Sequence, residues 1–266
     1  MSKGTKKGEN AFHAFYEALY PDRWKNILSA FQENKEYEEV TDLLRIPYYL
    51  DKASYMTASQ LFPEAGENVL DMCAAPGGKA LVLFTKMRGR GRLTVNDRSF
   101  DRLKRTQRVF KEHLPDEHDM DIRFTNKDAT KWFRYESNVY DKVLADVPCS
   151  SEVHVLGSKK HLGKWSPSRT KHLAIQAFAI LASALEAVKN SGIILYSTCT
   201  LSPLENDRVI EKLDKKRKGQ YKILPISADI GEPTEYGRII LPDKHPGMGP
   251  MYLSKIQKIR DYGVTK

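Results

Sequence analysis

The stretch ENVLDMCAAPGGKALVLFTKM, residues 67–87, decides the fold class of this chain. Its first seven residues form a short apolar run containing Asp71, which is typical of a buried strand. The segment AAPGGK then leads into a longer apolar run of helical character. A strand followed by a glycine-containing turn and a helix is the opening unit of an α/β fold.

The same alternation continues along the chain. Further strands are expected at 91–97, 121–128, 140–148 and 192–198, and helices at 99–114 and 168–190. This pattern predicts a mostly parallel sheet with helices on both faces. The runs YGRIILPD (236–243) and MGPMYLSKIQKI (248–259) are joined by KHPG, which predicts a hairpin that closes the sheet with an antiparallel edge.

The first part of the chain has a different pattern. Residues 1–45 carry aromatic and aliphatic side chains at mixed three- and four-residue spacing, broken at Pro21, which predicts a small helical region. A lead-in loop is expected at 46–54. We therefore expect an N-terminal helical extension at 1–45 and a catalytic-type α/β domain at 46–266.

The composition favours one sizeable domain with a polyanionic partner. The 266 residues are 41% hydrophobic, which is enough for a substantial core, and the net charge is +9. Three cysteines form no disulfide framework and indicate a reducing compartment. No apolar run is long enough to span a membrane, and the basic start MSKGTKKGEN has no secretory apolar region.

Four successive strands end in or beside an aspartate, namely Asp71, Asp97, Asp128 and Asp146. Ligands bind at the carboxyl ends of strands in such sheets, and a buried carboxylate is costly without a partner. Any single one could instead cap the following helix. Four together favour a ligand site, in which Asp97, at the end of the second strand, is well placed for two ribose hydroxyls.

The loop CAAPGGK, residues 73–79, lies between the first strand and its helix. Gly77 and Gly78 permit close approach of a ligand, and the helix start offers free N–H groups. Because Lys79 is followed by Ala80, the phosphate-binding pattern of nucleotide-triphosphate sites fails, and the dinucleotide pattern is also missing. The loop therefore favours an adenosine-type cofactor without a polyphosphate.

Two cysteines follow strands at equivalent places, Cys149 in LADVPCSS (144–151) and Cys199 in YSTCTLSPLEN (196–206). Cysteine is a strong nucleophile even at its ordinary pKa. A free cysteine considered alone is most often a small buried hydrophobe. Two of them at neighbouring strand ends, beside a cofactor loop, favour one shared site.

These three motifs resemble the cofactor loop and the two cysteine motifs of the Sun-domain RNA (cytosine-5)-methyltransferases. The resemblance covers roughly residues 46–260, and the segments YYLDKAS and GPMYLSKI are similar to the subgroup with mitochondrial-type rRNA and tRNA enzymes. It implies a Rossmann-like class I S-adenosylmethionine-dependent methyltransferase sheet, mostly parallel, with an antiparallel C-terminal hairpin.

The resemblance also implies S-adenosylmethionine as cofactor and gives the site residues their roles. It implies that Cys199 attacks carbon-6 of cytosine, that Cys149 assists release of the product, and that Asp146 hydrogen-bonds the amino edge of the base. No metal is expected. The implied cofactor-binding residues are Gly77, Gly78, Lys79, Asp97, Arg102, Asp128 and Asp146.

The implied partner is rRNA or tRNA. The basic segment 154–172, which includes Trp165, could grip phosphates around a flipped base or could be a solvated basic loop. Since no RNA-recognition module is evident, we expect target choice to come from a structured RNA, a ribosomal subunit or an accessory protein. A monomer in the cytoplasm is expected, with mitochondria as the alternative.

Other functions fit the motifs less well. Transfer to a nitrogen needs no covalent thiol, which argues against that acceptor, and a DNA enzyme should carry a separate target-recognition region. A non-catalytic RNA-binding scaffold that retains the cofactor pocket is the remaining alternative.

Overall fold

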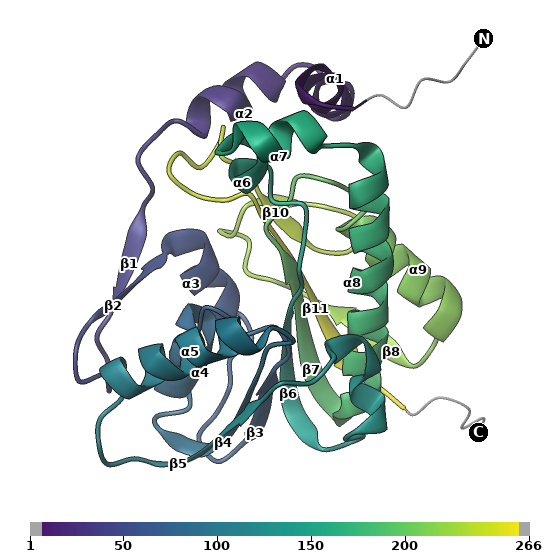
Figure 1. Cartoon of the computed structure of the whole chain (residues 1–266). Helices are drawn as coiled ribbons and strands as arrows, with labels where there is room; N and C mark the ends of the chain where they lie inside the picture. The colour runs from purple at the N-terminus through teal and green to yellow at the C-terminus, as the bar shows by residue number, and fades with distance from the viewer. Residues whose placement is uncertain (1–6, 261–266) are drawn as a thin grey trace.

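A twisted sheet runs through the computed structural model, which describes residues 7–260 (Figure 1). Its strand order is β5-β4-β3-β6-β7-β11-β10-β9, and β8 pairs with β11 beside this path. The strands are β3 (Asn68–Asp71), β4 (Arg90–Asn96), β5 (Asp119–Thr125), β6 (Tyr140–Asp146), β7 (Val188–Thr198), β8 (Tyr221–Leu224), β9 (Glu232–Pro233), β10 (Arg238–Ile240) and β11 (Met251–Lys258).

The five strands β3 to β7 are mutually parallel, as the sequence predicts. From β3 the chain steps outward through β4 to β5 and then crosses back to β6 on the other side of β3. The strand order therefore reverses between β3 and β6. In open α/β sheets, the crevice beyond the carboxyl ends of the strands at such a reversal is where ligands bind.

Alternate residues of the central strands pack into two separate cores. Leu70 and Ile194 belong to a cluster with α8 (Pro167–Ala187), whereas Val69 and Leu195 belong to a cluster with α4 (Gly78–Lys86). Both sets are fully buried, and burying one such side chain contributes about 1.5–3 kcal/mol. This two-sided burial explains why the strands read as apolar runs rather than as alternating patterns.

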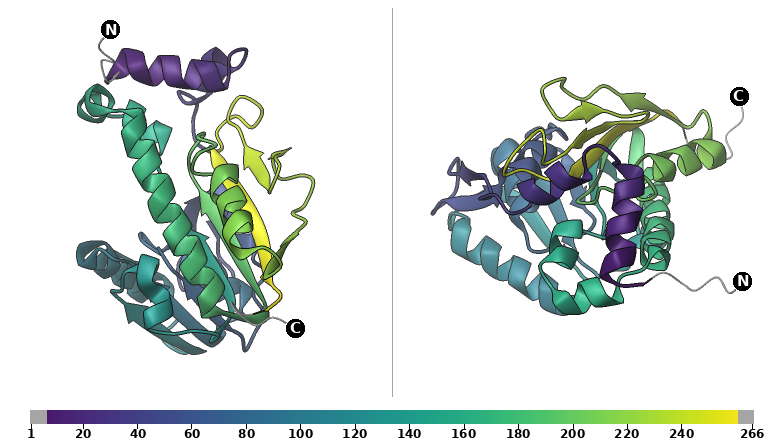
Figure 2. Two further views of the ribbon diagram at one scale, coloured as in Figure 1. Left: turned by 90° about the vertical axis from the view of Figure 1, so that its right-hand side faces the viewer. Right: turned by 90° about the horizontal axis from the view of Figure 1, so that it is seen from above.

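The remaining helices cover the two faces and the upper end of the sheet (Figure 2). They are α1 (Glu9–Leu19), α2 (Trp24–Ala30), α3 (Lys52–Ser59), α5 (Phe100–His113), α6 (Glu152–Leu156), α7 (Lys159–Lys164) and α9 (Asp207–Arg217), together with the short 3-10 helix η1 (Ala129–Arg134).

The C-terminal hairpin is confirmed, but its position differs from the expectation. β10 and β11 pair antiparallel, yet β11 is not an edge strand, because it also pairs antiparallel with β7 and with β8. The expectation missed β8 and β9, which have only four and two residues. Such short strands carry too little periodicity to be recognised.

Two expected boundaries are wrong. The helix expected at 168–190 ends at Ala187, because Val188 takes an extended conformation and pairs with Tyr140 at the start of β7. The loop expected at 46–54 contains β2 (Tyr48–Asp51) and the start of α3, whose first turn is capped by the Asp51 carboxylate.

The helical extension is confirmed for α1 and α2, which are separated at Pro21 as expected. It does not continue to residue 45, since β1 (Tyr37–Val40) pairs with β2 in a small separate sheet. In both views of Figure 2, α1 lies above the end of the sheet, beside α7. The proposed division of the chain at residue 45 stays a prediction.

Candidate active site

The carboxyl ends of β3 and β6 place two aspartates side by side at the reversal of strand order. Asp71 ends β3 and Asp146 ends β6, and these strands are neighbours. Burial, together with the charge of Asp146, raises the pKa of Asp71 from 3.8 to about 8. Its Oδ2 atom has no hydrogen-bond partner among the described residues. A buried carboxyl group of this kind is neutral at pH 7.

A cavity of about 360 Å³ lies on the β4 and β5 side of this point. It brings together Asp97, Arg102 and Asp128, three residues that the sequence assigned to the cofactor. Cys73, which we expect to serve only packing, also contributes to its wall. The lining residues are Met72, Cys73, Asp97, Arg98, Ser99, Arg102, Asp128, Ala129, Pro148, Gln176 and Ile180.

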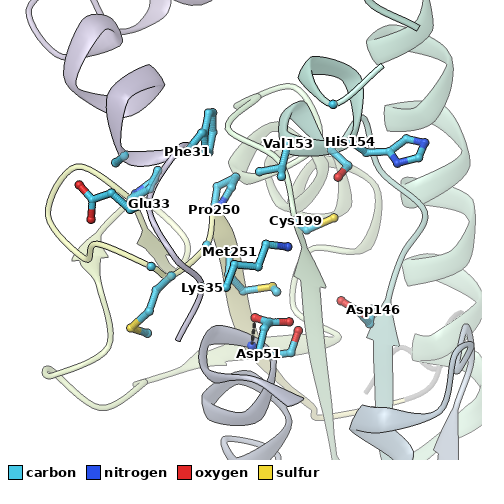
Figure 3. Close-up of a pocket in the computed structure, with 18 of the residues that line it drawn as sticks. Phe31, Glu33, Lys35, Asp51, Asp146, Val153, His154, Cys199, Pro250 and Met251 are labelled. Carbon is cyan, nitrogen blue, oxygen red and sulfur yellow. Dashed lines mark hydrogen bonds between the residues drawn. The ribbon is translucent and has the colours of Figure 1, made fainter. Parts of the chain in front are cut away.

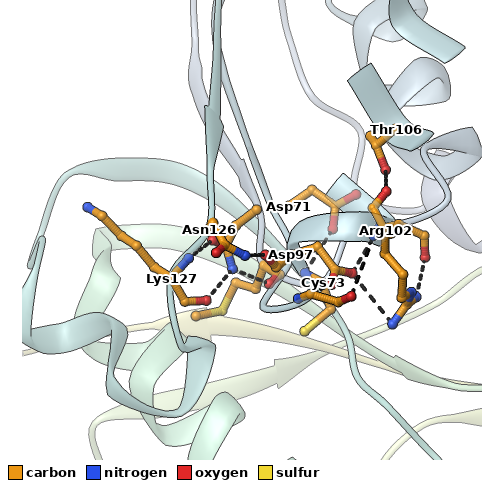
Figure 4. Close-up of polar contacts among 11 residues, drawn as sticks. Asp71, Cys73, Asp97, Arg102, Thr106, Asn126 and Lys127 are labelled. Carbon is orange, nitrogen blue, oxygen red and sulfur yellow. Dashed lines mark hydrogen bonds and ion pairs between the residues drawn. The ribbon is translucent and has the colours of Figure 1, made fainter. Parts of the chain in front are cut away.

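The Asp97 carboxylate is fixed at the wall of this cavity (Figure 4). It accepts hydrogen bonds from the backbone N–H of Ala75 at 3.3 Å and of Ser99 at 2.8 Å. The Arg102 guanidinium lies 3.6 Å from the carboxylate and donates to the carbonyl of Ala75 at 2.6 Å. A carboxylate can accept about four hydrogen bonds, so Asp97 retains capacity for a pair of hydroxyls.

Asp128 sits three residues beyond the end of β5. Its carboxylate accepts from the backbone N–H of Thr130 at 3.0 Å and from the Thr130 hydroxyl at 2.8 Å. These bonds outweigh burial and lower the pKa of Asp128. The cavity therefore carries fixed acceptors at two strand ends, which fits the ribose and adenine of an adenosine-type cofactor.

The two glycines of the loop serve the packing of the chain. Gly77 has φ 118°, a left-handed conformation that other residues rarely adopt. A Cβ atom on Gly78 would lie 2.7 Å from Leu50 and 2.9 Å from Tyr48, so α4 could not approach β2. Neither glycine lines the cofactor cavity, and their contact with a cofactor stays a prediction.

Lys79 connects the glycine loop to Asp146. Its ammonium lies 2.9 Å from Asp146 Oδ2 and donates to the Ser54 hydroxyl at 2.9 Å, while the Ser197 hydroxyl donates to Asp146 Oδ1 at 2.7 Å. Burial would lower the pKa of Lys79, but the charge and hydrogen bond of Asp146 raise it. Asp146 is thus held in one orientation by a permanent cation.

The thiols of Cys149 and Cys199 meet at the ends of β6 and β7, as the two motifs together suggest. Their sulfur atoms are 2.9 Å apart, and the backbone N–H of Cys199 lies 3.2 Å from the Cys149 sulfur. Neither forms a disulfide. Cys199 also lines the same cavity as Asp146 and Lys79.

The surroundings of the pair shift the pKa values of the two thiols in opposite directions. The hydrogen bond from the Cys149 thiol lowers the pKa of Cys199, and Ser151 and the Lys79 charge act in the same direction, against burial and Asp146. The same bond, with burial and the charge of Glu205, raises the pKa of Cys149 well above its usual value. Of the two thiols, Cys199 is therefore the more acidic one.

A second cavity, of about 530 Å³, opens above Cys199 and Asp146 (Figure 3). Phe31 and Lys35, from the segment that follows α2, form the opposite wall, and the Lys35 side chain points into the cavity. His154 lies at the side, and the loop 247–251 completes the wall. The N-terminal segment thus forms part of the site, which the sequence did not indicate.

One expectation about RNA contacts is wrong. Trp165 is only 2% exposed and packs against Phe12 at a centroid distance of 5.3 Å, so its ring is closed off from any base. The exposed basic groups of the segment 154–172 remain at the surface near the second cavity, and their contact with phosphates stays a prediction. They include His154, Lys159, Lys160, Lys164, Arg169 and Lys171.

Sequence reasoning also missed two buried glutamates, Glu152 and Glu205. Each is 0% exposed, and each lies a few residues after one of the two cysteines. They stand among polar residues in the loops that follow β6 and β7, so no apolar periodicity marks them as interior. Their hydrogen-bond partners lie far away in the sequence, so the local sequence does not indicate that these carboxylates are buried.

The family of the chain follows from its sequence match. The family model described as 16S rRNA methyltransferase RsmB/F matches residues 58–257, which include all three motifs. The chain belongs to this RsmB/F family. S-adenosylmethionine is the cofactor of these methyltransferases, and the cavity around Asp97 fits its adenosine part.

Several RsmB/F-type relatives align over most of the chain. The bovine protein named 5-cytosine rRNA methyltransferase NSUN4 is 34% identical over 79% of the chain and 59% of its own length. The zebrafish (Danio rerio) protein named mitochondrial tRNA (cytosine(34)-C(5))-methyltransferase is 32% identical over 82% of the chain and 62% of its own length. The chain therefore spans about three fifths of these relatives.

A solved structure of a similar protein has the same fold. The structure of NSun6 from Pyrococcus horikoshii with SFG, an analogue of S-adenosylmethionine, superimposes with a TM-score of 0.70 at 26% identity. It covers 81% of this chain and 54% of that chain. The likeness supports both the fold and the cofactor class.

Further expectations concern location and metals. No relative described above supports the cytoplasm, and one is named mitochondrial. Within residues 7–260, no helix is long and apolar enough to cross a membrane. The same residues include no cluster of histidine, cysteine or acidic side chains arranged to hold a metal ion.

Proposed function

We propose that the chain is an S-adenosylmethionine-dependent RNA (cytosine-5)-methyltransferase in which Cys199 attacks carbon-6 of the target cytosine. The observation that carries this proposal is the thiol pair, with sulfurs 2.9 Å apart, at a cavity that also holds Asp146. A nucleophilic thiolate, a donor thiol and an oriented carboxylate are the groups that carbon-5 methylation needs.

Carbon-5 of cytosine is too weak a nucleophile to take a methyl group directly. Addition of the Cys199 thiolate to carbon-6 shifts electron density onto carbon-5 and activates it. Asp146 accepts a hydrogen bond from the amino edge of the ring and stabilises the adduct. Because Lys79 and Ser197 hold the carboxylate, this acceptor needs no reorganisation as the adduct forms.

S-adenosylmethionine supplies the electrophilic methyl group. Asp97 binds the ribose hydroxyls, with Arg102 fixing the loop carbonyl beside it. Asp128 faces the adenine. Gly77, Gly78 and Lys79 would line the methionine and adenosine end of the cofactor, and Asp146 would lie at the boundary between the cofactor and the target base.

Release of the product requires that the carbon-5 proton leaves and that the bond between carbon-6 and sulfur breaks. Once Cys199 is bound to carbon-6, it no longer accepts the hydrogen bond of Cys149. The Cys149 thiol then loses its proton to solvent and, as a thiolate, takes the carbon-5 proton. The double bond between carbon-5 and carbon-6 re-forms, and the electron pair of the breaking bond returns to Cys199.

The substrate is rRNA or tRNA, since similar proteins are named for each. The basic residues of 154–172 contact phosphates around the flipped nucleotide. The enzyme acts as a monomer on an RNA presented by a ribosomal subunit or an accessory protein. High turnover of purified enzyme on a short stem-loop at one site would count against such a partner.

A denaturing gel tests the roles of the thiols. Wild type, Cys149→Ala and Cys199→Ala are incubated with unmodified cellular RNA and labelled S-adenosylmethionine. We expect a protein–RNA adduct that accumulates only in Cys149→Ala, because attack proceeds and release fails. Label transfer by Cys199→Ala without any adduct would refute the two-thiol mechanism. Cofactor binding without transfer in wild type would instead support the non-catalytic scaffold.

A further inference from the structure

The loops that carry the two thiols are tied together by two buried glutamates. Glu152 follows Cys149 but bonds to the loop after Cys199. Glu205 follows Cys199 but bonds to the loop after Cys149. Each thiol loop therefore provides the carboxylate that fixes the other.

Glu205 fixes the turn directly after Cys149. One of its oxygens accepts from the backbone N–H of Ser150 at 2.9 Å, and the other accepts from the Ser150 hydroxyl. The Ser150 hydroxyl also lies 3.1 Å from that of Thr170 on α8. The next residue, Ser151, has φ 49°, a left-handed conformation that is costly for any residue but glycine. The bonds of Glu205 hold the chain as it enters this turn.

Glu152 fixes the turn directly after Cys199. It accepts from the Thr200 hydroxyl at 2.6 Å and from the backbone N–H of Leu201 at 2.9 Å. A third donor comes from α1, since the Tyr16 hydroxyl bonds to the same carboxylate. Tyr20 adds a bond to the carbonyl of Leu201 at 2.7 Å. Residues outside the matched family region thus contact the loop of the nucleophile.

Two buried carboxylates are an expensive way to stabilise a fold. Burial raises the pKa of both Glu152 and Glu205, the latter to about 7, so ionising either carboxyl group inside the fold costs free energy. Well-packed apolar residues would often serve stability as well or better. Unlike apolar residues, the carboxylates accept hydrogen bonds from fixed directions. Every donor to them that is described above lies on a thiol loop or on α1.

Accepting the two-thiol mechanism proposed above, we propose that Glu152 and Glu205 are positioning residues that keep Cys149 in hydrogen-bonding contact with Cys199, and that Tyr16 brings α1 into this arrangement. Neither glutamate contacts the base. Each acts by fixing the backbone on the far side of the sulfur pair, so that the donor thiol stays 2.9 Å from the nucleophile.

The test measures the rate of iodoacetamide alkylation of Cys199 as a function of pH, with the modified peptide identified by mass spectrometry. All proteins carry Cys73→Ser, so that the third thiol does not react. Cys149→Ala removes the donor completely and gives the largest upward shift of the profile. We expect the pH profiles of Glu205→Gln and Glu152→Gln to shift in the same direction as that of Cys149→Ala. Their alkylation rate at pH 7 should be about tenfold lower than that of the protein carrying Cys73→Ser alone.

The sign of the shift separates positioning from charge. Loss of a nearby negative charge alone would lower the pKa of the thiols and speed alkylation at pH 7. Loss of the hydrogen bond raises the pKa of Cys199 and slows alkylation. Glu186→Gln, at the far end of α8 where Glu186 pairs with Arg217, is the matched control and should leave the profile unchanged.

Methyl transfer provides the second measurement. We expect kcat to fall about tenfold in both glutamate variants, while KM for RNA stays within twofold of wild type. Tyr16→Phe should show the same pattern with about a threefold loss. If a glutamine variant fails to fold, Thr200→Val and Ser150→Ala remove the hydroxyl bonds to Glu152 and Glu205 from the partner side.

The outcomes are distinct. Unchanged or faster alkylation in folded variants at both positions overturns the proposal, and so does slower alkylation with unchanged kcat. If wild type methylates no RNA, the proposed function fails, while the alkylation profile still decides whether the glutamates hold the thiols together.

Discussion

The cofactor cavity and the thiol pair lie at the same edge of one sheet but are held by different kinds of contact. Around the cavity, hydrogen bonds join positions 2 to 31 residues apart, as from Ser99 to Asp97 and from Asn96 to Lys127. Around the thiols, the bonds of Glu152, Glu205 and Tyr20 to the thiol loops join positions 48 to 181 residues apart, up to the bond from Tyr20 to Leu201. One half of the site is a property of neighbouring strands, whereas the other depends on the whole chain.

This difference suggests that the two halves fail separately. A strand-end aspartate keeps its neighbours even if a distant element shifts. The thiol loops need α1, α6 and the segment after β7 in place at once. The following changes test how far that separation goes.

The largest effect is expected for the nucleophile itself. Cys199→Ser should reduce methyl transfer at least about 1,000-fold, or roughly 4 kcal/mol, since a serine hydroxyl at this place has no base to activate it. Cofactor affinity, measured by calorimetry, should stay within twofold of wild type. A parallel loss of cofactor binding would show that the two halves are coupled.

The second prediction concerns the cofactor cavity, where Asp97 is the proposed acceptor for the ribose hydroxyls. Asp97→Ala should weaken cofactor binding about 100-fold, or about 2.7 kcal/mol, because two charge-assisted hydrogen bonds are lost. Alkylation of Cys199 by iodoacetamide needs no cofactor, and its rate should be the same in Asp97→Ala as in wild type. Asp101→Ala, on the exposed first turn of α5, is the control.

The carboxyl group of Asp71 makes stability depend on pH. Since its pKa is raised from 3.8 to about 8, the folded chain keeps a proton that the unfolded chain has released between these values. The stabilisation is complete below about pH 4 and is lost as the pH rises toward 8. The free energy of unfolding should fall by about 2 kcal/mol from pH 5 to pH 7.

Asp71→Asn should flatten this slope, leaving the smaller contribution of Glu205, whose pKa of about 7 acts in the same direction. Urea unfolding at several pH values measures the effect. Asp116→Asn, a carboxylate that is 90% exposed, should leave the slope as in wild type. An unchanged slope in Asp71→Asn would mean that Asp71 is ionised in the folded state.

The smallest effect is expected at the wall of the second cavity. Lys35→Ala should raise KM for RNA about threefold, or roughly 0.7 kcal/mol, because one phosphate contact is lost, and the loss should shrink at high salt. Lys25→Ala, an exposed lysine on α2, should have no such effect. Equal losses in the two variants would point to a diffuse charge effect instead of a contact.

The parts of the molecule that the sequence predicted are those with a local signal. The central strands, the helices between them and the strand-end aspartates follow from apolar runs bounded by turns. The cavity with Asp97 and Asp128 could be anticipated because parallel strands end at a common edge, whereas Arg102 was implied only by the family resemblance. The two cysteines could be paired for the same reason.

The missed parts lack such a signal. Glu152 and Glu205 look like solvated residues because their donors, Thr200 and Ser150, lie about 50 positions away. The burial of Trp165 within the basic segment 154–172 could not be predicted because its partner Phe12 in α1 is about 150 positions upstream. The wall formed by Lys35 required the position of α2, which depends on the stacking of Trp24 on Tyr16 and on the ion pairs of Arg23 with Glu232 and Asp243.

The place of β11 in the sheet has a consequence for biosynthesis. This strand is made after every other described strand, yet it lies between β7 and β10. The chain must therefore emerge from the ribosome as far as residue 258 before β11 can pair with β7, the strand that leads to Cys199. Until then, the two edges that flank the gap remain unpaired and open to pairing with another chain. Premature stop codons within β11 should accordingly yield aggregates rather than a partially active enzyme.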